Sequence, residues 1–292
     1  MIELPQEKLL IAPLIGSLDE IKQLQEEFYD FSQKVQLPEG IILANEYRPD
    51  KSLEQKFLKT LKGDDLRKYV AEFFHNFLVE VLANHPSEIP YVFTPRIESE
   101  GGLFPETLLD LRNQIYKRVI EGYNPFAIDV EMKTLGQFRQ AFPKKPEGVK
   151  IFGSEHFFEN DELPKNLYSE ADRLIELGEG FVDTYKLAVW SNSRGFDSHL
   201  AGIPSVFNIA GYNSIVVPMG ERDEIESARC GMLLTDAVGT FARFGEGTVK
   251  HQPKVEDVVN TLFKLSHVTA EDLREFGAGY ALQQARDAYE RA

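Results

Sequence analysis

The chain has 292 residues, of which 42% are hydrophobic and 27% charged, and its formal net charge is −15 at pH 7. This length suits one closed α/β barrel, and the absence of any run of about 18 apolar residues argues against a membrane-spanning helix. The negative charge argues against nucleic acid or an anionic membrane as a partner. The single cysteine, Cys230, excludes a disulfide framework within the chain and a cysteine-based metal site. The N-terminal residues carry charges and no cleavage site, so we expect a first strand and a cytoplasmic protein.

Short apolar runs alternate with longer amphipathic stretches along the chain. Strands are predicted at residues 8–16, 40–48, 91–96, 126–132, 148–157, 181–190, 214–220 and 233–241. Helices are predicted at residues 18–35, 64–84, 105–121, 133–142, 165–177, 199–210, 223–232 and 256–265. Strands that alternate with helices pair in parallel through crossovers, and eight such units favour a closed (β/α)8 barrel, or TIM barrel, over an open sheet.

Local sequence signals predict a helix near each end of the chain. Ser17 followed by Glu20 three residues later forms a capping box, which predicts the start of the first helix. A charged stretch at residues 269–291 predicts an extra helix. We therefore expect a catalytic barrel domain at residues 1–268 and a C-terminal helical extension packed on it at residues 269–292.

Lys186 is the main candidate for chemistry, because active sites in this fold lie where the strands end. It lies inside the apolar run FVDTYKLAVW, and strand alternation places it on the same face as Thr184 and Ala188. A lysine buried in an apolar interior loses its proton more easily, and a neutral amine attacks ketones and aldehydes. The alternative is a lysine paired with a carboxylate such as Glu46 or Asp129.

His156 follows the preceding strand, thirty residues before Lys186. A histidine there can act as a general acid or base near neutral pH, although a histidine bonded to a loop carbonyl is the alternative. Lys150 is the rival nucleophile. Six residues of strand span about 20 Å, so Lys150 is expected at the opposite end of the barrel, away from the active site.

Arginines at other strand ends suggest recognition of a carboxylate or of hydroxyl groups by planar guanidinium groups. The candidates are Arg48, Arg96 and Arg229. Surface salt bridges are the alternative for each, most strongly for Arg222 and Arg229 on a charged helix. The remaining histidines lack metal-ligand spacing, and the sequence EGG at residues 100–102 is too short for a phosphate loop. We expect neither a metal nor a cofactor.

Several short motifs occur at the predicted strand ends. They are NEYRPD (45–50), FTPRIESEGG (93–102), IDVEM (128–132), GSEHFFENDELP (153–164), DTYKLAV (183–189) and PMGE (218–221). In this order they resemble type I 3-dehydroquinate dehydratase, the Schiff-base enzyme of the shikimate pathway of aromatic amino acid biosynthesis. The resemblance runs from about residue 8 to residue 265.

The resemblance implies a role for each matched residue. Lys186 matches the Schiff-base lysine, His156 the catalytic histidine, and Glu100 the acidic residue that helps to position that histidine. The implied substrate-binding residues are Glu46, Arg48, Arg96, Arg229, Thr248 and Gln252, with Arg222 as an alternative to Arg229 because this loop is longer than in the family.

The loops that would cover the substrate differ from the family. Phe157 follows the histidine where the family has aspartate, and residues 247–253 read GTVKHQP in place of Ser-x-Pro-Gly-Gln. We expect a dehydratase that removes water from 3-dehydroquinate, a small anionic hydroxy-ketone acid, and that works as a homodimer. The alternatives are another class I Schiff-base lyase or aldolase acting on a related hydroxy-ketone acid, and a barrel that has lost catalysis and only binds ligand.

Overall fold

The computed structural model describes residues 7–159, 161, 166–222, 224–244, 252–265 and 268–291. They fall into two compact units. The first unit lies within residues 1–12, 35–44 and 154–292, and the second consists of residues 13–34 and 45–153.

Eight strands form one sheet. They are β1 (Lys8–Leu14), β2 (Ile41–Tyr47), β3 (Tyr91–Phe93), β4 (Ala127–Glu131), β5 (Lys150–Phe157), β6 (Thr184–Trp190), β7 (Asn213–Met219) and β8 (Gly239–Phe241). Their order is β7-β6-β5-β4-β3-β2-β1-β8. The pairs β1–β8, β2–β3, β3–β4 and β6–β7 are parallel. The N–H of Val238 donates to the carbonyl of Ser214 in β7 at 2.7 Å, which joins β7 to the start of β8. Consecutive strands that are neighbours, with the last beside the first, define a (β/α)8 barrel.

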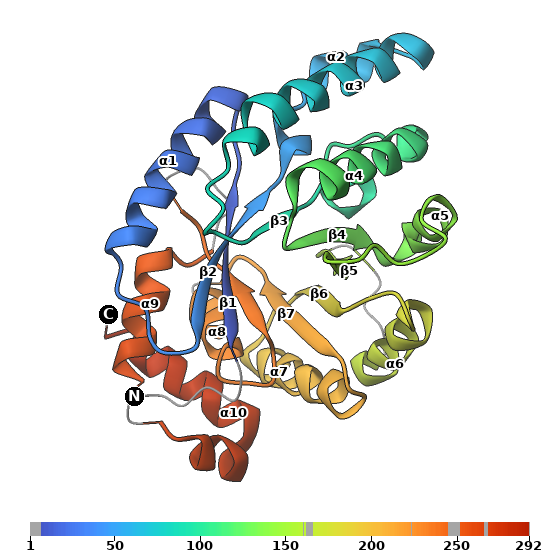
Figure 1. Cartoon of the computed structure of the whole chain (residues 1–292). Coiled ribbons are helices and arrows are strands. Elements are labelled where there is room, and N and C mark those ends of the chain that lie inside the picture. Colours follow the sequence, from blue (N-terminus) through green and yellow to red (C-terminus); the bar gives the residue numbers. More distant parts are fainter. Residues whose placement is uncertain are drawn as a thin grey trace. The chain divides into compact units, whose positions relative to one another are not determined.

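Helices follow the strands in alternation (Figure 1). The α-helices are α1 (Leu18–Lys34), α2 (Gln55–Thr60), α3 (Gly63–Glu80), α4 (Leu109–Tyr123), α5 (Leu135–Ala141), α6 (Leu167–Gly178), α7 (Arg194–Ile209), α8 (Glu224–Met232), α9 (Val255–Lys264) and α10 (Ala270–Tyr289). Short 3-10 helices are η1 (Pro49–Ser52), η2 (Leu82–Asn84), η3 (Glu98–Glu100), η4 (Glu106–Leu108) and η5 (Met132–Thr134).

The core of the first unit forms around β6 and β7, which pair along their whole length from Thr184 opposite Asn213 to Trp190 opposite Met219. The ring of Tyr185 stacks on Phe207 of α7, with centroids 5.0 Å apart. A β-carbon at Gly178 would lie 2.4 Å from the Tyr185 hydroxyl, so glycine lets α6 end against β6. The outward side chains of β6 thereby anchor the strand that carries Lys186.

The core of the second unit is aromatic. Phe74 and Phe77 of α3 are buried and lie in edge or tilted contact with Phe104 and Phe93, with centroids 5.5 and 6.3 Å apart. Tyr47, at the end of β2, also contacts Phe77 at 5.8 Å. Such pairs add stability beyond their buried area, and they fix α3 against the ends of β2 and β3.

Several predicted boundaries can be compared with the structure. The capping box is confirmed, because Glu20 accepts from the Ser17 N–H at 2.7 Å and Ser17 accepts from the Glu20 N–H at 3.3 Å. The predicted strand at residues 233–241 starts too early. The N–H groups of Leu233 to Thr235 donate to carbonyls three residues earlier, so these residues continue α8 as a helical turn. An apolar run does not by itself distinguish a strand from a buried helix end.

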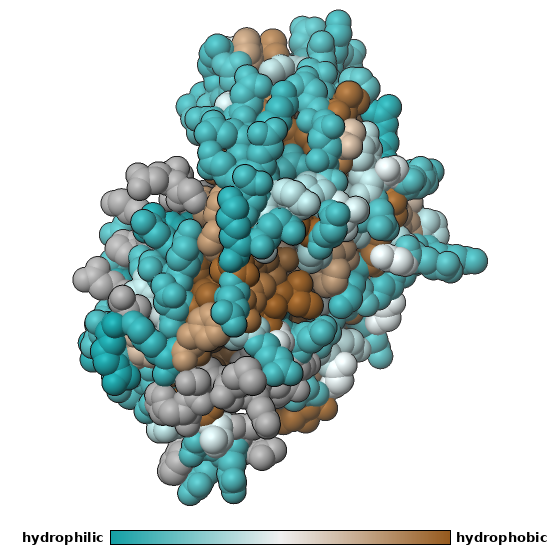
Figure 2. All heavy atoms as spheres, turned by 60° about the vertical axis from the view of Figure 1, so that its left-hand side comes forward, coloured by the Kyte–Doolittle hydropathy of each residue, from teal (hydrophilic) through white to brown (hydrophobic). Residues whose placement is uncertain are grey.

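Figure 2 shows hydrophilic residues over much of the face viewed. Among the described residues, no helix is both long enough and apolar enough to span a membrane.

Candidate active site

Lys186 is buried, with 5% of its surface exposed, and is the third residue of β6. Its register partner on β7 is Ile215. The Lys186 Nζ atom lies 4.2 Å from the centroid of the Phe241 ring, at the end of β8. Strands β6 and β8 thus bring an amine and an aromatic face together inside the first unit. A water-poor position of this kind suits an amine that must act as a nucleophile.

His156 is the seventh residue of β5 and is half-buried. Its ring stacks on Phe158, with centroids 6.1 Å apart and an angle of 14° between the planes. Lys150, the rival nucleophile, is the first residue of the same strand, is exposed, and lies 4.8 Å from the Phe126 ring. The two residues are therefore at opposite ends of β5, as the sequence predicted.

Arg229 is buried in the middle of α8, with 5% of its surface exposed. Its Nε atom donates to the carbonyl of Pro218, near the end of β7, at 2.9 Å. Burial lowers the pKa of Arg229 to about 10, and the nearby Glu226 opposes this shift. The guanidinium therefore stays charged at neutral pH and can bind an anion.

Arg222, the alternative to Arg229, lies just after β7 and is engaged by protein groups. Its guanidinium is 2.7 Å from a carboxylate oxygen of Asp197 and 3.6 Å from Glu224. The hydroxyl of Ser191, just after β6, donates to the other oxygen of Asp197 at 2.5 Å. This network ties the loop after β7 to the loop after β6.

The last loop is described only in part. Gln252 is buried, with 2% of its surface exposed. Thr248 lies outside the described residues, so its predicted role in substrate binding remains a prediction.

In the second unit, three charged residues from neighbouring strand ends form one buried cluster. Arg96 lies 2.7 Å from Asp129 and 3.9 Å from Glu46, and all three are at most 2% exposed. Thr94 donates to Glu46 at 2.9 Å. A β-carbon at Gly102 would lie 1.9 Å from the Arg96 carbonyl, so the turn after β3 needs glycine there. Glu46 and Arg96, both predicted for the site, are brought together within this unit.

Arg48 is held beside this cluster by a neighbouring carboxylate. Its Nε atom lies 3.3 Å from Asp50, which is fully buried. Asp50 also accepts a hydrogen bond from the N–H of Leu103 at 3.2 Å, so it links the loops after β2 and β3. The sequence motif NEYRPD contained Asp50, but its bridging role needed the structure.

Glu100 ends η3 and is 7% exposed. Burial raises its pKa to about 7, against the opposing effect of Lys133, whose Nζ atom lies 3.1 Å from Oε1. A carboxyl group with this pKa can both give and take a proton near neutral pH. No local sequence signal predicts the role of Lys133, because it lies 33 residues from Glu100 along the chain.

Arg112 and Glu131 form a second buried pair, at 2.5 Å, that the sequence did not predict. Arg112 also donates to Thr134 at 2.6 Å, and Glu131 accepts from the N–H of Ile97 at 3.1 Å. The pair thus fixes the segment between Arg96 and Glu100.

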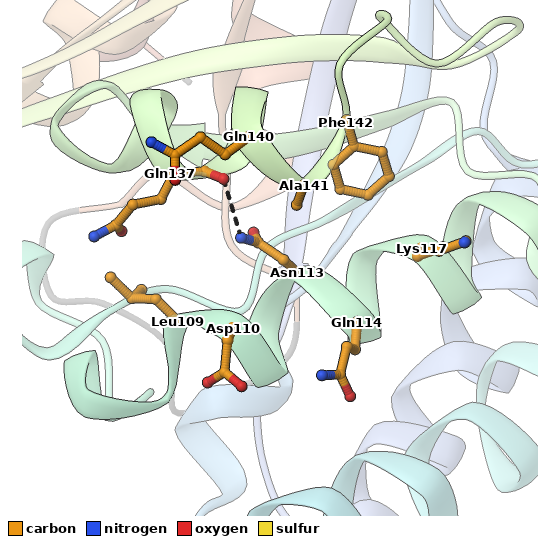
Figure 3. Close-up of a pocket in the computed structure, with 9 residues that line it drawn as sticks. All are labelled: Leu109, Asp110, Asn113, Gln114, Lys117, Gln137, Gln140, Ala141 and Phe142. Carbon is orange, nitrogen blue, oxygen red and sulfur yellow. Dashed lines mark hydrogen bonds between the residues drawn. The ribbon is translucent and has the colours of Figure 1, made fainter.

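An open pocket lies on the second unit between α4 and α5 (Figure 3). It is lined by Leu109, Asp110, Asn113, Gln114, Lys117, Gln137, Gln140, Ala141 and Phe142. Asn113 donates to the carbonyl of Gln137 at 3.4 Å across it. The lining holds no residue predicted for the site and no arrangement of a nucleophile with a base, so we do not assign the chemistry to it. Among the described residues, no three or more histidine, cysteine or acidic side chains are grouped for a metal ion.

The strand order defines a (β/α)8-barrel protein, and Lys186 is buried in its strand β6. The chain belongs to the type I 3-dehydroquinase family, whose model matches residues 68–267. This match confirms the resemblance seen in the sequence. The family consists of hydro-lyases of the shikimate pathway, and a lysine Schiff base is characteristic of it.

Solved structures confirm the barrel fold. The 3-dehydroquinate dehydratase from Geobacillus kaustophilus is 18% identical, with a TM-score of 0.62 over 90% of this chain and 92% of that one. The type I enzyme from Clostridium difficile, solved with covalently modified comenic acid, is 20% identical, with a TM-score of 0.59 over 89% and 93%.

A curated relative matches over a shorter stretch. The pentafunctional AROM polypeptide of Lachancea thermotolerans is 28% identical over 131 residues, which is 43% of this chain. The chain spans only 8% of that much longer protein.

Proposed function

We propose that this chain is itself a 3-dehydroquinate dehydratase and that Lys186 forms its Schiff base. One observation carries the proposal. In a chain of this family, Lys186 is buried in β6 beside the Phe241 ring, at the position of the motif DTYKLAV that matches the Schiff-base lysine. Burial keeps competing water away from an imine.

The proposed reaction begins when Nζ of Lys186 attacks the C3 ketone of 3-dehydroquinate. Loss of one water molecule leaves an iminium ion, which withdraws electrons and acidifies the proton on C2. His156 removes that proton and then protonates the C1 hydroxyl, which leaves as water. Hydrolysis of the iminium then consumes one water molecule and releases 3-dehydroshikimate. Two water molecules are released and one is consumed, so the net reaction is the loss of one water. General acid–base help of this kind contributes about 10²- to 10⁴-fold in rate.

The other roles are proposed from the family resemblance and from the chemistry of each residue. Glu100, with a pKa of about 7, is suited to exchanging a proton with a histidine or to orienting it. Planar guanidinium groups match carboxylates and vicinal hydroxyls. The proposed substrate-binding residues are Glu46, Arg48, Arg96, Arg229, Thr248 and Gln252. We favour Arg229 over Arg222, because the Arg222 guanidinium already pairs with Asp197.

The test is turnover of 3-dehydroquinate by the purified chain, followed by the ultraviolet absorbance of the conjugated enone product. The proposal predicts turnover by the wild type and none by Lys186→Ala. A Lys186→Ala protein as active as the wild type would overturn the lysine mechanism. A wild type that is thermally stabilised by 3-dehydroquinate without consuming it would be a binding barrel instead of an enzyme.

We further propose that the protein acts in the cytoplasm as a homodimer. Support for the compartment comes from the single cysteine of the sequence. Light scattering during size-exclusion chromatography tests the dimer, because a monomer and a dimer of this 33.2 kDa chain differ twofold in mass.

A further inference from the structure

Helix α10 follows the part of the chain that the family model matches, which ends at residue 267. It begins at a capping box formed by Thr269 and Asp272. Non-helical backbone at Gly277, with φ 73°, divides it into two helical segments. Within the first unit, α10 packs against α7, α8 and α9, and Figure 1 shows it beside them. A helix with these contacts is part of the packed unit and can influence the positions of side chains on the neighbouring helices.

Helix α8 is covered closely by α10. Seven of its nine residues are buried, namely all those from Ile225 to Met232 except Glu226. A β-carbon at Gly231 would lie 2.6 Å from the Leu282 side chain and 3.2 Å from the Leu282 Cα atom. Glycine at this position therefore allows the α10 backbone to approach α8, and the position of α8 depends on α10.

A polar contact joins the same two helices. The hydroxyl of Tyr289, near the end of α10, donates to the Oε2 atom of Glu226 in α8. Burial and the Glu226 carboxylate both raise the pKa of Tyr289, so the hydroxyl keeps its proton and remains a donor. Glu226 is half-buried, and the hydrogen bond from Tyr289 holds its carboxylate toward α10.

Glu226 is also a potential competitor for Arg229. The two residues lie three positions apart on one helix, a spacing at which a carboxylate and a guanidinium can pair. In the part of the chain that the structure describes, the only hydrogen bond of the Arg229 guanidinium runs from Nε to Pro218. Its two terminal nitrogens are the ones with which a planar guanidinium binds a carboxylate.

We propose that α10 is a positioning element for the substrate-binding arginine: Tyr289 holds the Glu226 carboxylate and so keeps Arg229 open to an anionic substrate. This role rests on the proposed function, in which Arg229 binds 3-dehydroquinate. It assigns a purpose to a helix outside the matched family region. It also makes Tyr289 a positioning residue that touches neither the substrate nor Lys186.

The experiment compares the kinetics of Tyr289→Phe with those of the double variant Tyr289→Phe and Glu226→Gln. In the single variant the freed carboxylate pairs with Arg229 for part of the time. If that pair forms about 70–90% of the time, KM rises about 3- to 10-fold while kcat stays nearly constant. In the double variant the neutral amide cannot pair as an ion, so KM returns to within about twofold of the wild type.

Gln283→Ala is the matched control, because Gln283 is exposed on α10 and bonds only within that helix among the described residues. It should leave KM and kcat unchanged. An unchanged KM in Tyr289→Phe, or an equal rise in the single and double variants, would overturn the role of Tyr289. A wild type without turnover would overturn the proposed function as well, and turnover is therefore measured first. Melting temperatures of all variants separate a loss of folding from a loss of binding.

Discussion

Glu100 offers a test of site electrostatics that does not depend on catalysis. Its pKa is about 7 in the folded chain against an ordinary value of 4.5. An acid whose pKa is raised on folding lowers stability as the pH rises through that window, because the folded state must then bury a charge. One pKa unit corresponds to about 1.36 kcal/mol. The raised pKa of Glu100 therefore lowers the free energy of unfolding by about 3 kcal/mol at pH 8, and by about 1 kcal/mol at pH 5, where the carboxyl is ionised in the unfolded chain only.

Glu100→Gln removes this titration while keeping an oxygen for Lys133. We expect the free energy of unfolding of the wild type, relative to the variant, to fall by about 2 kcal/mol between pH 5 and pH 8, as measured by urea denaturation. Glu106→Gln is the control, because a hydrogen bond from Ser99 lowers the pKa of Glu106 and places its titration below this window. Parallel pH profiles for the wild type and Glu100→Gln would show that Glu100 does not titrate in this window.

Three further predictions concern single residues. Glu131→Ala should lower the free energy of unfolding by about 3–5 kcal/mol, because it leaves the Arg112 charge and the Ile97 N–H buried without their partner. Glu131→Gln should lower it less. A loss below about 1 kcal/mol for Glu131→Ala in urea denaturation would contradict this. His156→Ala should still form a borohydride-trapped imine but turn over about 10²- to 10⁴-fold more slowly; normal turnover would remove His156 from the mechanism. Arg229→Lys should raise KM about tenfold, because a point charge replaces a bidentate contact; an unchanged KM would point to Arg222 instead.

The fold could be predicted from the sequence because alternating apolar runs and helix caps are local signals. The eight predicted strands all occur, and Lys150 and His156 lie at opposite ends of one strand as strand length requires. The ends of helices and strands were less predictable where tertiary contacts determine them. Residues 233–235 read as strand but continue α8, and the short helix α2 (Gln55–Thr60), which has no buried residues, gave no periodic apolar signal.

The candidate site could be predicted only one residue at a time. Sequence motifs identified Arg96 and Glu46, but their shared cluster with Asp129 depends on pairing between strands far apart in the chain. The partners Lys133 and Arg112 carry no local motif, since their roles follow from burial beside carboxylates that the fold brings to them.

If Lys186 is the nucleophile, its imine with the substrate can be trapped as a covalent adduct. The measurement is the intact mass of the protein after incubation with 3-dehydroquinate and borohydride, with peptide mapping of the modified residue. Lys186→Ala and Lys150→Ala are compared with the wild type. We expect one covalent adduct on Lys186 in the wild type and in Lys150→Ala, and none in Lys186→Ala. An adduct that persists in Lys186→Ala, or a folded wild type that forms none, would contradict this expectation.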